Sequence, residues 1–163
     1  MRRTLKLLHT LSAMGMGGAL AASIALLARA PAMDEVAAYL ELRANLAAIA
    51  RFVLLPSAAL CLVSGLLSIA VHQPFHNAGW AWFKALTGVV VFEGTLGGID
   101  SPARRALEIL GGPAPVDPAT LAGLLRHEWG ALWIILFLSV LNVVFGIWRP
   151  KFRRRVARGR AAD

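Results

Sequence analysis

The sequence predicts an all-α integral membrane protein, an antiparallel four-helix bundle whose long helices extend beyond the bilayer. Its 163 residues are 58% hydrophobic, well above the ~45–50% apolar content of an average soluble domain. The apolar residues gather in four segments of about 20 residues, the length needed to cross a ~30 Å hydrocarbon core. Basic residues concentrate at the two ends of the chain, which is typical of cytoplasmic flanks. At this length we expect one domain covering residues 1–163.

The four apolar segments differ in the ionisable residues that they contain. They cover residues 7–28, 52–71, 80–99 and 129–148. The second and fourth have no charged residue, and the first is interrupted only by His9. Its flanks also resemble a cleavable secretory signal, but its apolar run exceeds the ~7–15 residues of a signal core, so we interpret it as a span. The third contains Lys84 and Glu93, and its tryptophans fit an interfacial aromatic belt.

Helix-starting residues and prolines set the expected element boundaries. Asp34 suits a helix N-terminus, and the apolar pattern then runs directly into the second span. We therefore expect one long helix, bent at Pro56. Pro102 and Pro118 each follow a residue that can cap a helix, and proline is favoured at the first helical position. They predict a short helix over 102–110 and a long one entering the fourth span.

The net charge of +8 resides in the two tails. The basic tail residues are Arg2, Arg3, Lys6, Arg149, Lys151, Arg153, Arg154, Arg155, Arg158 and Arg160. Because four spans return the chain to its starting side, we expect both termini, including the basic tail 149–163, in the cytoplasm. The expected partner is the lipid bilayer, with no nucleic acid bound. The small residues between Gly15 and Ala25 let another helix approach the first span, so a homo-oligomer is compatible with the sequence.

An inner pair of ionisable residues carries the sharpest chemical hypothesis. At ~1.5 Å per residue, His9 and Lys84 both lie roughly 6 Å inside the cytoplasmic boundary, so they can face each other. A neutral imidazole is a good ligand for haem iron, and a desolvated lysine can become one. The alternative is a pair that only hydrogen-bonds to the backbone or extends toward the headgroups.

An outer layer of charges belongs to the opposite side of the membrane. Glu93 lies roughly 13 Å beyond Lys84 and about 180° around the helix, so the two cannot easily pair. We expect its neighbours to be Arg51, Arg126, His127 and Glu128. These residues form either structural ion pairs or a proton or ion relay.

Short motifs in all four spans resemble those of the HemJ-type protoporphyrinogen oxidases and of related, uncharacterised integral membrane proteins. They are Lys6-Leu7-Leu8-His9 with Gly17-Gly18-Ala19-Leu20, Arg51…Pro56…Gly65, Gly79-Trp80…Lys84, and Arg126-His127-Glu128 before Arg149-Pro150-Lys151. The resemblance implies a four-helix membrane bundle with haem b at the positions of His9 and Lys84. The chain departs from the HemJ pattern at Met14, Gly15, Glu93, Thr95 and His127.

Two functional hypotheses follow. The first is a haem b-associated redox or electron-transfer protein of the bacterial inner (plasma) membrane, with His9 as an iron ligand and Lys84 as its partner. The second is a non-enzymatic membrane scaffold, or a small ion or metal transporter, whose intramembrane charges form structural ion pairs.

Overall fold

A computed structural model describes residues 2–72, 78–113 and 115–148, and within these ranges the chain is helical with no strand. Its elements are α1 (Arg2–Leu27), α2 (Val36–Ile49), η1 (Ala50–Leu54), α3 (Leu55–Val71), α5 (Gly79–Thr95), η2 (Leu96–Asp100), α6 (Ser101–Leu110) and α7 (Pro118–Trp148). The segments η1 and η2 are single π-helical turns. The basic tail 149–163 lies outside the described residues. The predicted all-α class is confirmed.

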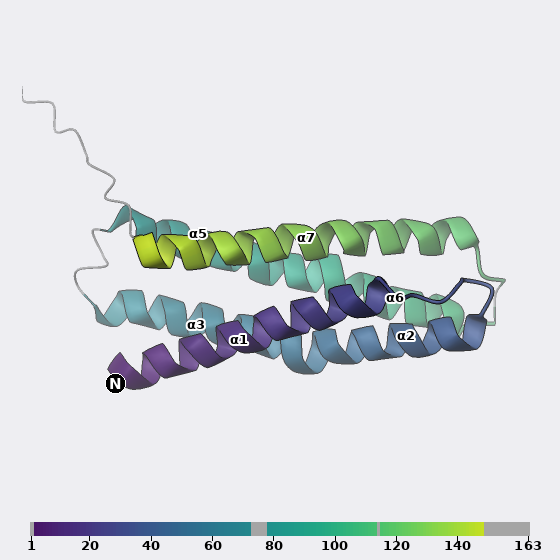
Figure 1. Cartoon of the computed structure of the whole chain (residues 1–163), viewed down its shortest axis with the longest axis horizontal. Coiled ribbons are helices and arrows are strands. Elements are labelled where there is room, and N and C mark those ends of the chain that lie inside the picture. Colours follow the sequence, from purple (N-terminus) through teal and green to yellow (C-terminus); the bar gives the residue numbers. More distant parts are fainter. Residues whose placement is uncertain (1, 73–77, 114, 149–163) are drawn as a thin grey trace, which may run out of the picture.

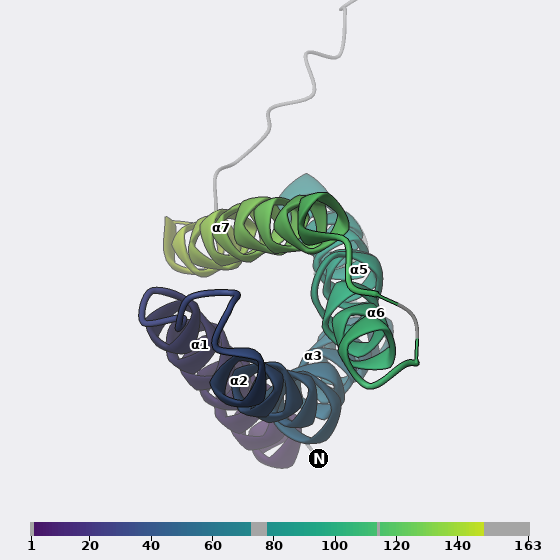
Figure 2. The same cartoon turned by 90° about the vertical axis from the view of Figure 1, so that its right-hand side faces the viewer.

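The long helices form an elongated assembly (Figure 1). Helix α1 packs against α3, α3 against α5, and α5 against α7, and the end-on view in Figure 2 shows them in that order around a ring. The start of α1 and the end of α7 lie at the same end of the molecule. At the other end α2 and α6, which continue α3 and α5, pack against each other.

Three of the described helices are long and apolar enough to cross a membrane. They are Arg3–Leu27, Val36–Val71 and Pro118–Trp148. They contain the second and fourth predicted spans and all of the first except Ala28. The predicted third span, 80–99, lies in α5 and η2 and is not among the three; its apolar run is interrupted by Lys84 and Glu93.

Two helices contain a π-turn shortly before a proline. The predicted long helix is confirmed, because α2, η1 and α3 are continuous, and the π-turn ends two residues before Pro56. A second π-turn stands in the same relation to Pro102. The short helix ends at Leu110 as predicted, but it is not a separate helix: Asp100 has helical angles, φ −64° and ψ −46°, so the chain stays helical from Gly79 onward. A proline has no backbone N–H to donate to the regular helical hydrogen-bond ladder, and a π-turn just before it changes that ladder locally.

Helix α7 begins at the cap predicted from its sequence. The carboxylate of Asp117 accepts hydrogen bonds from the amides of Ala119 (3.1 Å) and Thr120 (3.2 Å) and from the Thr120 hydroxyl (2.6 Å). These bonds, the one from the hydroxyl foremost, hold the pKa of Asp117 below its ordinary value. Pro118 then occupies the first helical position, where its missing N–H costs nothing.

The core lies where the helices converge. Buried leucines and isoleucines of α1, α2, α7 and the π-turns form the main cluster, among them Leu20, Leu46 and Leu132. Helix α1 lies close to α3 at Gly15, where a Cβ atom would lie 2.7 Å from the Ser57 hydroxyl. This glycine therefore serves helix packing within the chain.

Candidate functional site

A pocket of about 510 Å³ lies between α1, α3, α5 and α7, and both residues of the predicted inner pair line it. His9 enters from α1 and Lys84 from α5, each half-buried. The walls are mostly apolar, with a few hydroxyl and amide groups. The volume is within the ~300–1,000 Å³ of typical small-molecule sites. The structure thus brings together two residues that are 75 positions apart in the sequence.

Hydrogen bonds to α3 fix the imidazole of His9. Its Nδ1 atom lies 3.0 Å from the Cys61 carbonyl oxygen and 3.1 Å from the Ser64 hydroxyl. Because a carbonyl can only accept, we assign the proton to Nδ1, which leaves the lone pair on Nε2. The Nε2 atom lies 3.9 Å from the Cys61 sulfur. Histidines that bind metals usually have this arrangement, with the other ring nitrogen donating to a backbone carbonyl.

Two glycines make room for the inner pair. A Cβ atom at Gly65, one helical turn after Cys61, would lie 3.4 Å from Cε1 of His9. A Cβ atom at Gly146 would lie only 2.7 Å from Nζ of Lys84. The lysine amine therefore lies against the α7 backbone, and a side chain at position 146 would displace it. The position of the Lys84 amine thus relies on the missing side chain at Gly146, whereas Gly65 only lets α3 lie in contact with the His9 ring.

Hydrogen bonds orient the polar groups on the pocket wall that α5 and α7 form. The Thr87 hydroxyl of α5 donates to Oδ1 of Asn142 on α7, at 2.6 Å. This bond orients the Asn142 amide, which lines the pocket. The hydroxyl of Ser139, another lining residue, donates to the carbonyl of Ile135 at 2.7 Å. Both polar groups are therefore held in place by α5 and α7.

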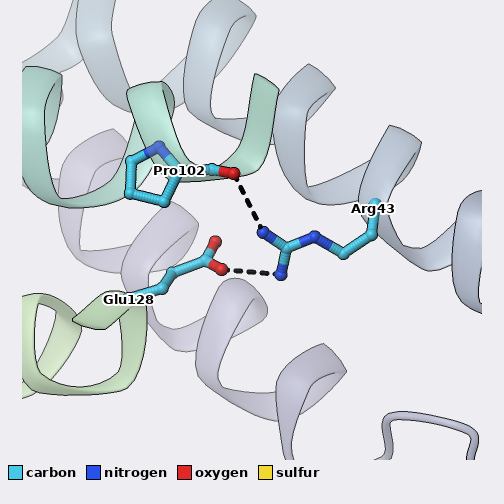
Figure 3. Close-up of polar contacts among 3 residues, drawn as sticks. All are labelled: Arg43, Pro102 and Glu128. Carbon is cyan, nitrogen blue, oxygen red and sulfur yellow. Dashed lines mark hydrogen bonds and ion pairs between the residues drawn. The ribbon is translucent and has the colours of Figure 1, made fainter. Parts of the chain in front are cut away.

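A buried ion pair lies in the half of the molecule formed by α2, α6 and the first turns of α7, here called the outer half (Figure 3). Nη1 of Arg43 donates to Oε2 of Glu128 at 2.6 Å, and the two side chains are 1% and 0% exposed. Nη2 of Arg43 also donates to the Pro102 carbonyl, at 3.4 Å. One guanidinium therefore joins α2, α6 and α7. Arginine suits this role because its planar group offers several donors in fixed directions.

The other members of the predicted outer layer are on the surface. Glu93, Arg51, Arg126 and His127 are exposed, and among the described residues no ion pair joins them. Only Glu128 of this set is buried. Glu93 lies away from the pocket that Lys84 lines, as the 180° separation predicted. The proton or ion relay stays a hypothesis.

Sequence reasoning missed Arg43, although its signal was present. Tyr39, Leu42, Arg43 and Leu46 have the i, i+3, i+4, i+7 spacing of one helix face, and all four are buried. An arginine within such an apolar stripe needs a buried partner. The stripe therefore indicated a carboxylate opposite α2.

No protein-family model, curated protein or solved structure matches the chain. Among the described residues there is also no group of three or more His, Cys, Asp or Glu residues placed to hold a metal ion. An iron held in a porphyrin needs fewer ligands from the protein, because only one or two axial ligands are required. His9 and Lys84 offer donor atoms of that kind.

Proposed function

We propose that the chain is a four-span protein of the bacterial inner membrane that binds haem b in the pocket between α1, α3, α5 and α7. The observation that carries this proposal is the hydrogen bonding of the His9 imidazole. It lines the pocket with Nδ1 bound to the Cys61 carbonyl, which leaves Nε2 for a metal. Lys84 is the proposed second ligand, or a partner of the bound group.

Large exposed apolar side chains on all four long helices support membrane insertion. They are Leu7, Leu11 and Met14 on α1, Val63 and Leu67 on α3, Trp82, Leu86 and Val90 on α5, and Trp133, Ile134 and Phe137 on α7. A soluble monomer rarely exposes apolar patches larger than a few hundred Å². Lipid would cover these residues, and α5 would then be the third of four spans. Helix α1 starts and α7 ends at one end of the molecule, and the basic flanks of these two helices favour a cytoplasmic position for that end.

The pocket fits a flat, largely apolar cofactor. A Cβ atom at Gly17 of α1 would meet nothing within 4 Å, so the pocket wall is open there. His9 would bind the iron through Nε2, the Cys61 carbonyl would orient its ring, and the apolar walls would exclude water. Haem iron supplies one-electron chemistry when bound. The surrounding side chains tune its potential through ligand basicity and burial.

Spectroscopy of the purified protein tests the proposal. Protein purified in detergent from haem-replete cells should show a Soret band, and His9→Ala should remove it. Gly17→Leu should also remove it by filling the pocket. Gly18→Leu is the matched control, because a Cβ there also meets nothing within 4 Å but the residue does not line the pocket. A colourless, folded wild-type protein would refute haem binding.

The buried Arg43–Glu128 pair favours a second candidate, a non-enzymatic membrane scaffold. The pair joins three helices and lines no part of the pocket. In this case the ionisable residues serve the fold alone, and the protein would fold without any chromophore. Glu93→Gln separates this role from transport: lost ion flux in vesicles with an unchanged fold would instead indicate a relay.

A further inference from the structure

The pocket has a second basic residue, Lys6, at its edge. Lys6 lies one turn before His9 on α1, and both line the pocket together with Thr10, Ala13 and Gly17. These spacings of three and four residues place them on one face of the helix. Lys6 is exposed whereas His9 is half-buried. Lys6 therefore lies at the solvent-exposed end of an α1 face that continues into the apolar pocket.

The charged groups of the pocket have a single sign. Of the residues that line it in the described part of the chain, Lys6 and Lys84 are the charged ones, and no carboxylate accompanies them. Lys84 lies inside, against the backbone at Gly146. A low-dielectric pocket with cations and no anions attracts a negatively charged ligand group.

The pocket also reaches the surface between α1 and α7. Its lining includes exposed residues of both helices: Lys6 and Thr10 on α1, Val140 and Val143 on α7. Figure 2 shows the α1 and α7 ribbons on neighbouring sides of the ring, and the two helices are in contact. In a membrane, the two valines would face lipid tails, and Lys6 would lie near the headgroups.

We propose that the pocket takes an anionic amphiphile from the bilayer through the opening between α1 and α7, with the acid group of the ligand held by Lys6. This inference rests on the proposed function, because haem, with an apolar ring and two propionates, belongs to this class. It adds an orientation: the propionate edge at Lys6 and the ring deeper, beside His9. Lys6 is then a binding residue for the acid and has no role toward a neutral ligand.

Haem and its uncharged dimethyl ester test this assignment in the full-length protein in detergent. Lys6→Ala should raise the Kd for haem about 3–5-fold, the loss expected for an exposed ion pair, and leave the Kd for the ester unchanged. Arg3→Ala is the matched control, since Arg3 is exposed on the same helix end but does not line the pocket. It should change neither constant. Lys6→Glu should weaken haem binding further and again spare the ester.

The possible failures are distinguishable. If the wild-type protein binds neither compound, the proposed function is refuted and this inference with it. If haem binds but Lys6→Ala and Arg3→Ala have equal effects, the assignment of Lys6 is wrong and the haem site stands. Equal loss of haem and ester in Lys6→Ala would likewise overturn the acid contact, because it would show a loss of packing.

Discussion

The buried Arg43–Glu128 pair gives the sharpest prediction about stability. We expect Arg43→Met to destabilise the protein by about 3–5 kcal/mol, because it leaves the carboxylate of Glu128 buried without its partner. That range corresponds to a change of more than about a hundredfold in the folding equilibrium. Methionine is shorter than arginine but keeps an unbranched chain and most of the side-chain volume, so the loss mainly reports the charge and its hydrogen bonds.

Few other polar groups around the pair offset the desolvation of its two charges. Oε1 of Glu128 and Nε of Arg43 are buried and have no hydrogen-bond partner among the described residues. The desolvation of the two charges is therefore offset mainly by their mutual bond and by the Pro102 carbonyl. For the same reason the double variant Arg43→Met, Glu128→Met should be more stable than either single variant.

Unfolding in mixed micelles, followed by circular dichroism, measures these differences. The control is Arg105→Ala, which removes an exposed arginine of α6 that belongs to neither ion pair of the described residues. Its loss should change the stability by less than about 0.5 kcal/mol. The reasoning is refuted if Arg43→Met costs no more than this control. It is also refuted if the double variant loses the sum of the two single losses.

Three further predictions concern helix contacts and a cap. Gly98→Ala should destabilise by about 1–3 kcal/mol in the same assay, because its Cβ would lie 2.5 Å from Cβ of Ala131; Gly97→Ala, whose Cβ meets nothing, should not. Asp117→Ala should lower the melting temperature at neutral pH. Because the folded-state pKa of Asp117 is lowered, its contribution exists above the ordinary pKa and disappears as pH falls through the folded value, so wild type and variant should converge in acid. Thr87→Val should cost about 0.6 kcal/mol, the average for an interhelical hydrogen bond in a membrane protein, and an unchanged stability would contradict the bond to α7.

Local signals in the sequence were sufficient for most of the helix layout. Asp117 and Pro118 determine the start of α7 through a cap that involves only neighbouring residues. Helix α2 begins at Val36 with Glu35 at its N-cap, one residue later than Asp34 suggested, and its continuity to Val71 followed from the apolar pattern. The start of α6 could not be read in the same way, because Ser101 and Pro102 form an equally good N-cap signal. In the structure the helix instead continues from the preceding π-turn into Ser101 without a break.

Depth along the helices predicted part of the candidate site. The equal depth of His9 and Lys84 anticipated that they line one pocket. The partner of Glu128 could not be found by depth, because Arg51 and Arg126 lie nearer than Arg43 to the ends of the predicted spans. Choosing among these arginines requires knowing which face of its helix each one occupies. Arg43 shares the buried stripe of Tyr39, whereas the others point to the surface.

The π-turns explain how one helix can serve both halves of the molecule. Leu46, Ala50, Leu54 and Ala58 are all buried, at three successive steps of four residues. On a regular α-helix each such step turns by about 40°, so the face would drift by about 120° over the three. The π-turn at 50–54 takes up one extra residue, or about 100°, and so cancels most of the drift. The same spacing crosses the second π-turn, at Val91, Thr95, Ile99 and Ala103. Both helices can therefore direct one side toward the Arg43 ion pair in the outer half and toward the pocket in the inner half, and a one-residue deletion within either π-turn should separate these two alignments.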